Sequence, residues 1–231
     1  MRLHRFIGDF DLSKNEVKIT DPQIIKKIKA VLRIKSGEKI ILSDGRGEEA
    51  ETTLISIGSE LIKGLVGKKE RRGEVEGGIN LYLSILKKEN FELAVQKAVE
   101  TGVSSITPTI TERTIKTGLN FERLKKIIKE ASEQSGRSIV PHLHSILNFE
   151  DAIIDGKKSK IKILFHPAGN FYRPNKEQGA ISIFIGPEGG FTERELERAK
   201  EEEYDVFSLG HFTLRAETAA MIAVYRTANN I

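Results

Sequence analysis

The spacing of hydrophobic positions in the first third of the chain is that of short strands. Apolar runs at 40–42, 52–57 and 61–66 are separated by polar turn residues. Asp44-Gly45, after the first run, is a typical hairpin turn, and short strands joined by tight turns predict a small β-barrel. Ahead of them, Asp21-Pro22 has the N-cap and first-turn proline of a helix start.

The helix that starts there has isoleucine, valine and leucine at helical spacing. Its apolar face is predicted to contain Ile24, Ile25, Ile28, Val31 and Leu32. Further on, the charged run at 68–73 is the expected linker. We therefore place a domain boundary near Arg72, with a β-barrel at 1–72 and a second domain at 73–231.

From residue 79 onward, strand-like and helix-like patterns alternate. Strands are predicted at 79–86, 106–110, 161–165, 181–185 and 206–209. Helices are predicted from an Asn90 cap to Gly102, at 121–135, at 149–154 and at the C-terminal end. Because helices separate most of the strands, the pattern indicates an α/β fold with a largely parallel sheet covered on both faces.

Composition narrows the class of protein further. The chain has 231 residues, 39% hydrophobic and 30% charged, which suits one large domain or two small ones. It has no cysteine, and its histidines lack the spacing of an HExxH metal site, so no metal is expected. No apolar run resembles a signal peptide or a membrane span, and a cytoplasmic protein without membrane contact is expected. The net charge of +4 is compatible with nucleic acid binding.

The stretch at 180–220 contains the candidate chemistry. An apolar strand runs into Gly186-Pro187-Glu188-Gly189-Gly190, and Thr192 precedes Glu195 at the spacing of a capping box. A strand, a glycine-rich loop and a helix form a ligand-binding geometry in α/β proteins, although glycines can simply turn the chain. The loop matches neither a Walker A motif nor a GxGxxG fingerprint, which disfavours phosphate or dinucleotide binding.

Two loops together resemble a known family. GPEGGFTERE at 186–195, followed by LG and LRAETA at 209–219, closely resembles the C-terminal signature of SPOUT methyltransferases. Within that class it resembles the bacterial family that methylates N3 of a uridine in 16S ribosomal RNA. Further matches, which extend the resemblance over nearly the whole chain, are VLRIKSGEKIILSDGRG at 31–47, QKAVETGV at 96–103 and EASEQSGR at 130–137.

The resemblance implies features of the fold, the cofactor and the substrate that the residue pattern alone does not indicate. It implies a PUA-like RNA-binding β-barrel at 1–72 and a SPOUT methyltransferase domain at 73–231 with a C-terminal trefoil knot. Knots are nearly absent from proteins, so periodicity could not have indicated this one. It also implies S-adenosyl-L-methionine as cofactor, a homodimer, and 16S rRNA or the small ribosomal subunit as substrate.

The resemblance also implies the site residues. The cofactor pocket is expected to be mainly backbone from three loops, with Leu164, Phe165, His166, Ile185, Gly186, Pro187, Glu188, Gly190, Leu209, Gly210, Leu214, Arg215, Ala216 and Thr218. The uracil N3 proton must leave during methylation. Arg215 is the candidate cation for the negative charge that develops, and Glu188 and Glu217 are possible proton acceptors. Glu217 could equally be a first-turn carboxylate that favours the helix dipole.

Basic and polar side chains supply the candidate RNA contacts. They are Arg2, Arg5, Arg33, Arg113, Gln134 and Arg137, each of which could instead belong to a solvated face. Two positions depart from the family pattern. The family has arginine two residues after the glycine of the Leu-Gly loop, where this chain has Phe212 after His211, and often a basic residue where this chain has Asn90.

Three alternative functions have testable differences. A SPOUT ribose 2′-O-methyltransferase would use the same cofactor fold and give a different product. A non-catalytic RNA-binding assembly factor would not need the two intact loops. A nucleotide-binding enzyme of Rossmann type would need a phosphate loop, which this chain lacks.

Overall fold

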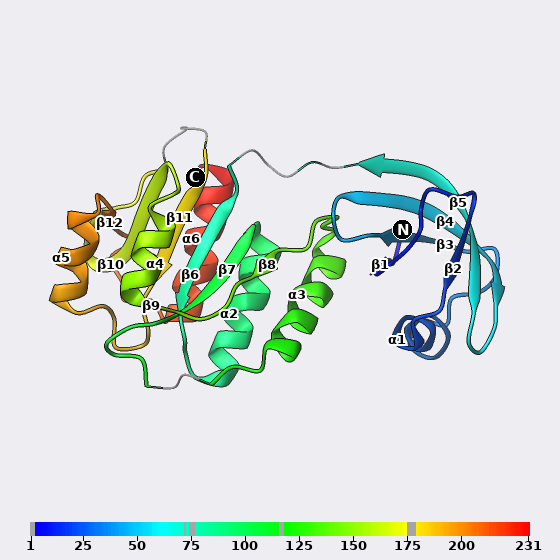
Figure 1. Cartoon of the computed structure of the whole chain (residues 1–231), viewed down its shortest axis with the longest axis horizontal. Helices are drawn as coiled ribbons and strands as arrows, with labels where there is room; N and C mark the ends of the chain where they lie inside the picture. Colours follow the sequence, from blue (N-terminus) through cyan, green and yellow to red (C-terminus); the bar gives the residue numbers. More distant parts are fainter. Residues whose placement is uncertain (1–2, 72, 74–76, 116–117, 175–178) are drawn as a thin grey trace. The chain divides into compact units, whose positions relative to one another are not determined.

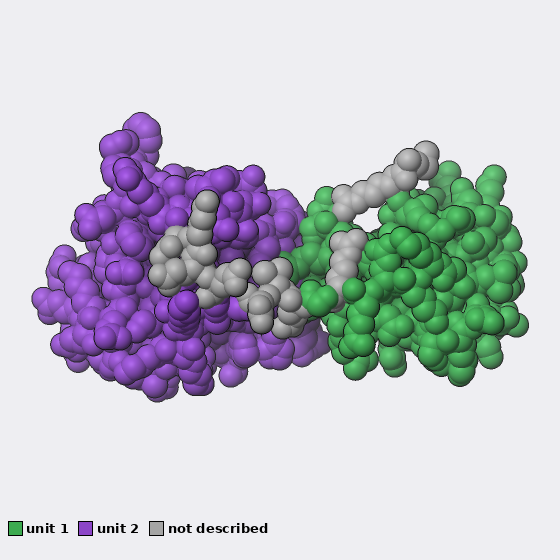
Figure 2. Space-filling model, turned by 90° about the horizontal axis from the view of Figure 1, so that it is seen from above, with its two compact units in different colours: residues 1–74, 132–140 green, residues 75–131, 141–231 purple. Residues whose placement is uncertain are grey.

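The computed structural model describes residues 3–71, 73, 77–115, 118–174 and 179–231. The chain forms two compact units, coloured green and purple in Figure 2. The first contains residues 1–74 and 132–140, and the second contains residues 75–131 and 141–231. Within the described ranges, no helix combines the length and the apolar composition that crossing a membrane requires.

The first unit contains a five-stranded sheet with the order β1-β3-β4-β5-β2. Its strands are β1 (Arg5–Ile7), β2 (Glu16–Ile19), β3 (Lys39–Ser43), β4 (Glu48–Ile57) and β5 (Ile62–Arg71). Only β1 and β3 pair in parallel. The three predicted strands and the hairpin at Asp44-Gly45 are confirmed. The sequence pattern missed β2, whose four residues are too few to establish an alternation.

The charged run expected to be a linker is largely strand. Lys69, Glu70 and Arg71 pair with Ala50, Glu49 and Glu48 at the start of β4. The prediction was wrong here because strand pairing uses backbone groups, and the charged side chains of this segment are exposed. Arg72, where the boundary was placed, lies outside the described residues.

Helix α1 (Pro22–Lys26) begins as predicted. The Asp21 side chain accepts hydrogen bonds from the amides of Gln23 and Ile24, at 2.7 and 3.3 Å. The helix continues as a single π-helical segment, η1 (Lys27–Val31), which changes the angular spacing of its side chains. For this reason Val31, predicted on the apolar face, is 66% exposed.

A segment distant in sequence completes the first unit. The Glu133 carboxylate accepts a hydrogen bond from the Ile7 amide at 3.0 Å and pairs with Lys27 Nζ at 2.8 Å. The Ser138 carbonyl accepts from Ser43 Oγ at 3.2 Å. The domain bounds 1–72 and 73–231 stay a prediction, and in the structure residues 132–140 pack with the first unit.

The second unit is a parallel sheet with the order β12-β10-β11-β6-β7-β8, and β9 also pairs with β7 (Figure 1). Its strands are β6 (Ile79–Ser84), β7 (Ser105–Ile110), β8 (His142–Leu143), β9 (Leu147–Asn148), β10 (Ile161–Phe171), β11 (Ile181–Ile185) and β12 (Asp205–Ser208). Every pairing among them is parallel. The predicted α/β fold with a parallel sheet is confirmed.

Five helices lie beside this sheet in the described part of the unit (Figure 1). They are α2 (Lys88–Thr101), α3 (Phe121–Ser135), α4 (Phe149–Gly156), α5 (Glu193–Glu201) and α6 (Ala216–Asn229). Tyr82, Leu164 and Phe184 form a core cluster with side chains of α4 and α5, whereas α2 packs against α6. Asn90 does not cap α2, which begins two residues earlier, but Gly102 ends it with a φ of +117° as predicted.

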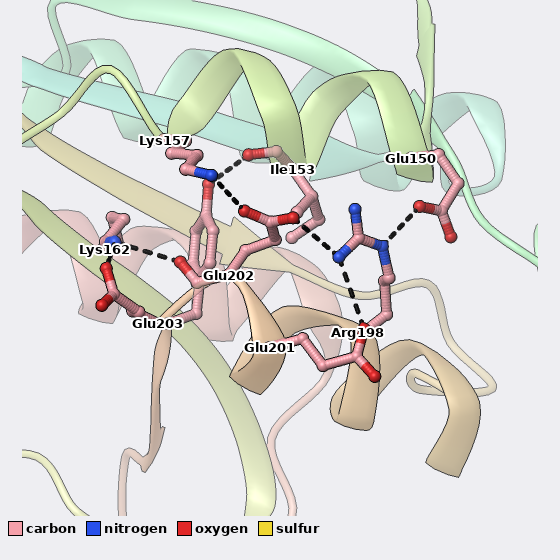
Figure 3. Close-up of polar contacts among 9 residues, drawn as sticks. Glu150, Ile153, Lys157, Lys162, Arg198, Glu201, Glu202 and Glu203 are labelled. Atoms are coloured by element: carbon pink, nitrogen blue, oxygen red, sulfur yellow. Dashed lines mark hydrogen bonds and ion pairs between the residues drawn. The ribbon is translucent and has the colours of Figure 1, made fainter.

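Ion pairs join α5 to α4 (Figure 3). Arg198 Nε lies 2.8 Å from Glu150 on α4, and Arg198 Nη1 lies 2.8 Å from Glu202. Lys157, after α4, contacts the same Glu202 at 2.6 Å. The bonds from Lys157 and Arg198 lower the pKa of Glu202. Such surface networks contribute modestly and weaken in salt.

Candidate active site

A pocket of about 640 Å³ lies at the carboxyl ends of β10, β11 and β12. This is where open parallel sheets bind ligands, and the volume is typical of a small-molecule site. The residues that line it are Lys87, Asn90, Phe165, His166, Pro167, Ile185, Gly186, Pro187, Glu188, Gly189, Gly190, Phe191, Ser208, Leu209, Phe212, Thr213, Leu214, Arg215, Ala216, Glu217 and Ala219.

The glycine loop after β11 is held in a fixed turn. The Gly190 amide donates to the Pro187 carbonyl at 2.9 Å, and Gly190 has a φ of +69°. A Cβ atom there would have only His166 Nε2 nearby, at 3.9 Å, so the backbone angle is what favours glycine. Arg113 Nη1 donates to the Gly189 carbonyl at 2.7 Å. These contacts hold the loop so that its backbone lines the pocket.

His166 lies in a short excursion of β10. Both Phe165 and Asn170 pair with Phe207 on β12, so the residues between them leave the strand ladder. His166 Nδ1 accepts the Ala168 amide at 3.2 Å. Burial lowers the pKa of His166, and the cation of Arg113 lowers it further, against the opposing effect of Glu193. The imidazole is thus favoured in its neutral form with its proton on Nε2.

The start of α6 contains two charged side chains in unusual surroundings. Glu217, in the first helical turn, has a side chain that is only 10% exposed. Among the residues that the structure describes, none donates a hydrogen bond to its Oε2 atom. Arg215 Nη1 is 4.0 Å from Glu217 Oε1, and the Arg215 side chain is 83% exposed. A buried carboxylate oxygen without a donor is costly, and it fits a pocket whose ligand brings positive charge.

Glu188 has a more local role. Its Oε1 accepts the amide of Lys87, the residue before α2, at 3.1 Å. This bond ties the glycine loop to the start of α2 and occupies one carboxylate oxygen. Glu188 is therefore less suited to accept a proton than Glu217.

Most of the predicted cofactor-binding residues line this pocket. Those that do are Phe165, His166, Ile185, Gly186, Pro187, Glu188, Gly190, Leu209, Leu214, Arg215 and Ala216. Leu164 instead lies in the core beneath α4 and α5, because alternate residues of β10 face opposite sides of the sheet. Gly210 and Thr218 are also outside the lining. Whether the lining residues contact a cofactor stays a prediction.

Sequence reasoning missed several lining residues. Lys87 and Asn90 come from a third part of the chain, beside β6, and only sheet order places them near β11. Phe191 and Ser208 adjoin predicted loops, so extending each loop by one residue would have found them. Phe212 was noted only as a departure from the family pattern.

The predicted RNA contacts are placed differently from one another. Arg5 pairs with Glu49, and its side chain is only 8% exposed, which leaves it no surface for a polyanion. Arg33 and Gln134 are exposed, and Arg137 is half-buried. Arg113 belongs to the second unit and braces the glycine loop, whereas Gln134 and Arg137 belong to the first. Arg2 lies outside the described residues.

In the described part of the chain, no group of three or more histidine, aspartate or glutamate side chains is arranged to hold a metal ion. The pocket instead offers backbone, one neutral imidazole, one buried carboxylate and one exposed guanidinium. These groups fit an organic ligand that carries both polar and cationic parts.

Comparison with known proteins identifies the class. Residues 74–228 match the model of an RNA methyltransferase domain, and residues 19–66 match that of an RNA methyltransferase PUA domain. The fold is thus a PUA-like domain followed by a SPOUT methyltransferase domain, as the sequence resemblance implied.

Curated and solved relatives narrow this class to one family. The chain is 31% identical to ribosomal RNA small subunit methyltransferase E 2 of Borreliella burgdorferi, over 92% of this chain and 91% of that protein. It is 28% identical to the Rickettsia conorii methyltransferase E, over 97% and 94%. A methyltransferase E from Neisseria gonorrhoeae, crystallised with S-adenosyl methionine, superposes with a TM-score of 0.85 at 28% identity, over 96% and 95%. The chain belongs to the ribosomal RNA small subunit methyltransferase E family.

Proposed function

We propose that this protein transfers a methyl group from S-adenosyl-L-methionine to N3 of a uridine in 16S rRNA. The family supports the reaction class, and a solved relative is bound to this cofactor. The observation that carries the proposal on this chain is the Glu217 carboxylate, which is buried in the pocket wall with an unpartnered oxygen. A ligand that brings a positive charge or a hydrogen-bond donor would satisfy such a group.

Three loops would hold the cofactor. The backbone of 186–190, the His166-Pro167 excursion and the turn from Leu209 to Ala216 surround the pocket. When bound, S-adenosyl-L-methionine supplies an electrophilic methyl group on a positively charged sulfur. Glu217 offers the matching negative charge. The neutral His166 adds no positive charge that would repel the sulfur.

Arg215 and Glu217 would carry the chemistry on the substrate side. The exposed Arg215 guanidinium is free to face a nucleobase oxygen and to stabilise the negative charge that forms as N3 loses its proton. Glu217 lies 4.0 Å from that guanidinium and is better suited than Glu188 to accept the proton. If Glu217 acts as the acceptor, its replacement will lower turnover as well as cofactor affinity.

The reaction is tested with purified protein, cofactor and rRNA lacking the modification. Titration calorimetry in EDTA should show S-adenosyl-L-methionine binding, and Gly190→Val should remove it because valine disfavours a φ of +69°. Mass spectrometry of the product should show methylation on the uracil base. A methyl group on ribose would establish the 2′-O alternative, and binding of RNA without any methyl transfer would favour the assembly factor.

We propose that the first unit increases affinity for RNA. Its exposed Arg33 and Gln134, and the matched PUA domain, support this role. Glu133 and Ser138 accept hydrogen bonds from residues of the barrel, and deleting residues 1–72 would remove these bonds. Point variants therefore test RNA binding without disturbing the fold. Arg33→Ala should weaken RNA binding and reduce its salt slope by about one unit, with cofactor affinity unchanged.

A homodimer and a C-terminal knot complete the proposal. Family resemblance supports both. Among the apolar residues of α6, Ala220, Ala223 and Val224 are buried in this chain, whereas Ala219 and Ile222 are half-buried and Tyr225 is exposed, so the last three could face a partner. Light scattering at micromolar concentration decides the oligomeric state, and a mass near 25.8 kDa would contradict the dimer.

A further inference from the structure

Phe212 is a large apolar side chain that the described structure leaves almost fully in solvent. It is 86% exposed and lines the pocket. The other two phenylalanines of the lining, Phe165 and Phe191, are 7% and 3% exposed and form part of the protein core. Of the three phenylalanines that line the pocket, Phe212 is therefore the one whose ring a ligand could still cover.

The loop that carries Phe212 is anchored just before this residue. Ser208 Oγ donates to the Gly210 carbonyl at 2.9 Å and accepts the Gly210 amide at 3.3 Å. The next ring, His211, packs edge-on against Phe171 of β10 with 4.6 Å between centroids. After Phe212, α6 begins at Ala216. Because its neighbours are held, Phe212 is presented outward by the fold.

The charges near Phe212 favour a nucleic acid. The exposed Arg215 follows it by three residues, and Lys87 lines the same pocket. Single-stranded nucleic acids are bound by this combination, in which cations meet phosphates and aromatic rings stack on unstacked bases.

We propose that Phe212 stacks on a base of the RNA substrate and positions the target uridine at the mouth of the pocket. The inference rests on the proposed function, because it names the side chain that holds the substrate of that reaction. Phe171 and His211 brace the loop from which the ring projects. Phe212 is a positioning residue, and the chemistry stays with Arg215 and Glu217.

The chain contains no tryptophan, so Phe212→Trp introduces a single reporter at this position. Its fluorescence should be quenched when a single-stranded RNA carrying the target uridine is added to the cofactor-saturated protein. Ile154→Trp is the matched control, since Ile154 is 49% exposed on α4 and is not among the lining residues. RNA should leave that reporter nearly unchanged.

Two other outcomes would overturn the inference. Quenching by S-adenosyl-L-methionine alone, without further change on adding RNA, would place the ring on the cofactor's adenine. A spectrum that depends on protein concentration without ligand, and no longer responds to RNA, would place the ring in a subunit interface. Either result assigns Phe212 an occupant other than RNA.

Kinetics provide the second readout. Phe212→Leu keeps an apolar side chain but removes the ring, and should raise the KM for RNA on the order of tenfold to a hundredfold. Phe212→Tyr should restore it, while the cofactor Kd stays constant in both variants. An unchanged KM for Phe212→Leu, in an assay where the unaltered protein methylates, overturns the inference. If the unaltered protein does not methylate, the proposed function fails, and the RNA titration of Phe212→Trp still decides the inference.

Discussion

The starts of α5 and α6 both bury a glutamate in the first helical turn, and the two glutamates have opposite surroundings. Glu195 at the start of α5 accepts the Thr192 amide at 2.8 Å and the Glu112 amide at 2.9 Å. Thr192 accepts the Glu195 amide in return, which completes a capping box. Glu217 at the start of α6 is similarly buried, yet its Oε2 finds no donor in the described part of the chain.

The arginines of the two helices show the same contrast. Arg198 on α5 pairs with Glu150 and Glu202 (Figure 3). Arg215, the N-cap residue of α6, lies 4.0 Å from Glu217 and is 83% exposed. The α5 start is satisfied from within the protein, whereas the α6 start holds a carboxylate oxygen without a donor in the described residues and an exposed guanidinium. We therefore expect variants of the first to change stability and variants of the second to change function.

The largest effect is expected at Arg215. Arg215→Ala should lower turnover by roughly a hundredfold or more, because it removes a preorganised cation from the charge that develops on the base. Affinity for the cofactor should change much less. The measurement is the single-turnover rate at saturating RNA.

Arg215→Lys is the matched variant for this prediction. If a point charge is enough, lysine will keep most of the rate, and if the planar guanidinium is needed, it will not. A near-normal rate for Arg215→Ala would remove this residue from the catalytic machinery. If Arg215→Ala lowered the melting temperature as much as Glu195→Ala on α5 does, the two helix starts would not differ in the way proposed.

The next effect is expected at Glu217. Glu217→Gln keeps the shape but removes the charge, and should weaken cofactor binding on the order of tenfold to a hundredfold. Stability should be unchanged or higher, since an unpartnered buried carboxylate no longer has to be desolvated. Calorimetric titration and urea unfolding measure the two quantities. Lower stability with unchanged cofactor affinity would mean that Glu217 is satisfied within the protein.

Glu195 should give the opposite result. Glu195→Ala removes the capping box and leaves the amides of Thr192 and Glu112 without their acceptor, so unfolding should become easier by about 2 kcal/mol. Cofactor affinity should stay within a factor of two to three. Glu197→Ala, an exposed position on the same helix, is the control and should have little effect on urea unfolding. Equal losses in both variants would argue against the cap.

The smallest effect is expected from the ion pairs of Arg198. Arg198→Ala should lower the melting temperature slightly, and high salt should abolish the difference. The ion pairs lower the pKa of Glu202 below its ordinary value of 4.5. The stability that these ion pairs contribute is therefore fully present above pH 4.5, and it is lost as the pH falls through the lowered pKa. The unfolding curves of the unaltered protein and of Arg198→Ala should therefore converge in acid. A difference that persists there would assign the effect of Arg198 to packing.

Local patterns determined much of this protein from sequence alone. Apolar spacing located α3 at its observed bounds, and the Thr192–Glu195 spacing identified the capping box. The two loop motifs placed most of the pocket correctly, because the strands before them are parallel and end at the same edge of the sheet. These features depend on residues within a few positions of one another, so a single stretch contains the information.

Only the tertiary structure decided the remaining features. The attachment of residues 132–140 to the first unit depends on bonds such as that from Ile7 to Glu133, between residues 126 positions apart. The burial of Arg5, the isolation of the Glu217 oxygen and the exposure of Phe212 are likewise fixed by what packs nearby. An arginine, a glutamate or a phenylalanine in a sequence has no fixed environment. Its solvation, and with it its role, is set by neighbours that the chain brings together only when it folds.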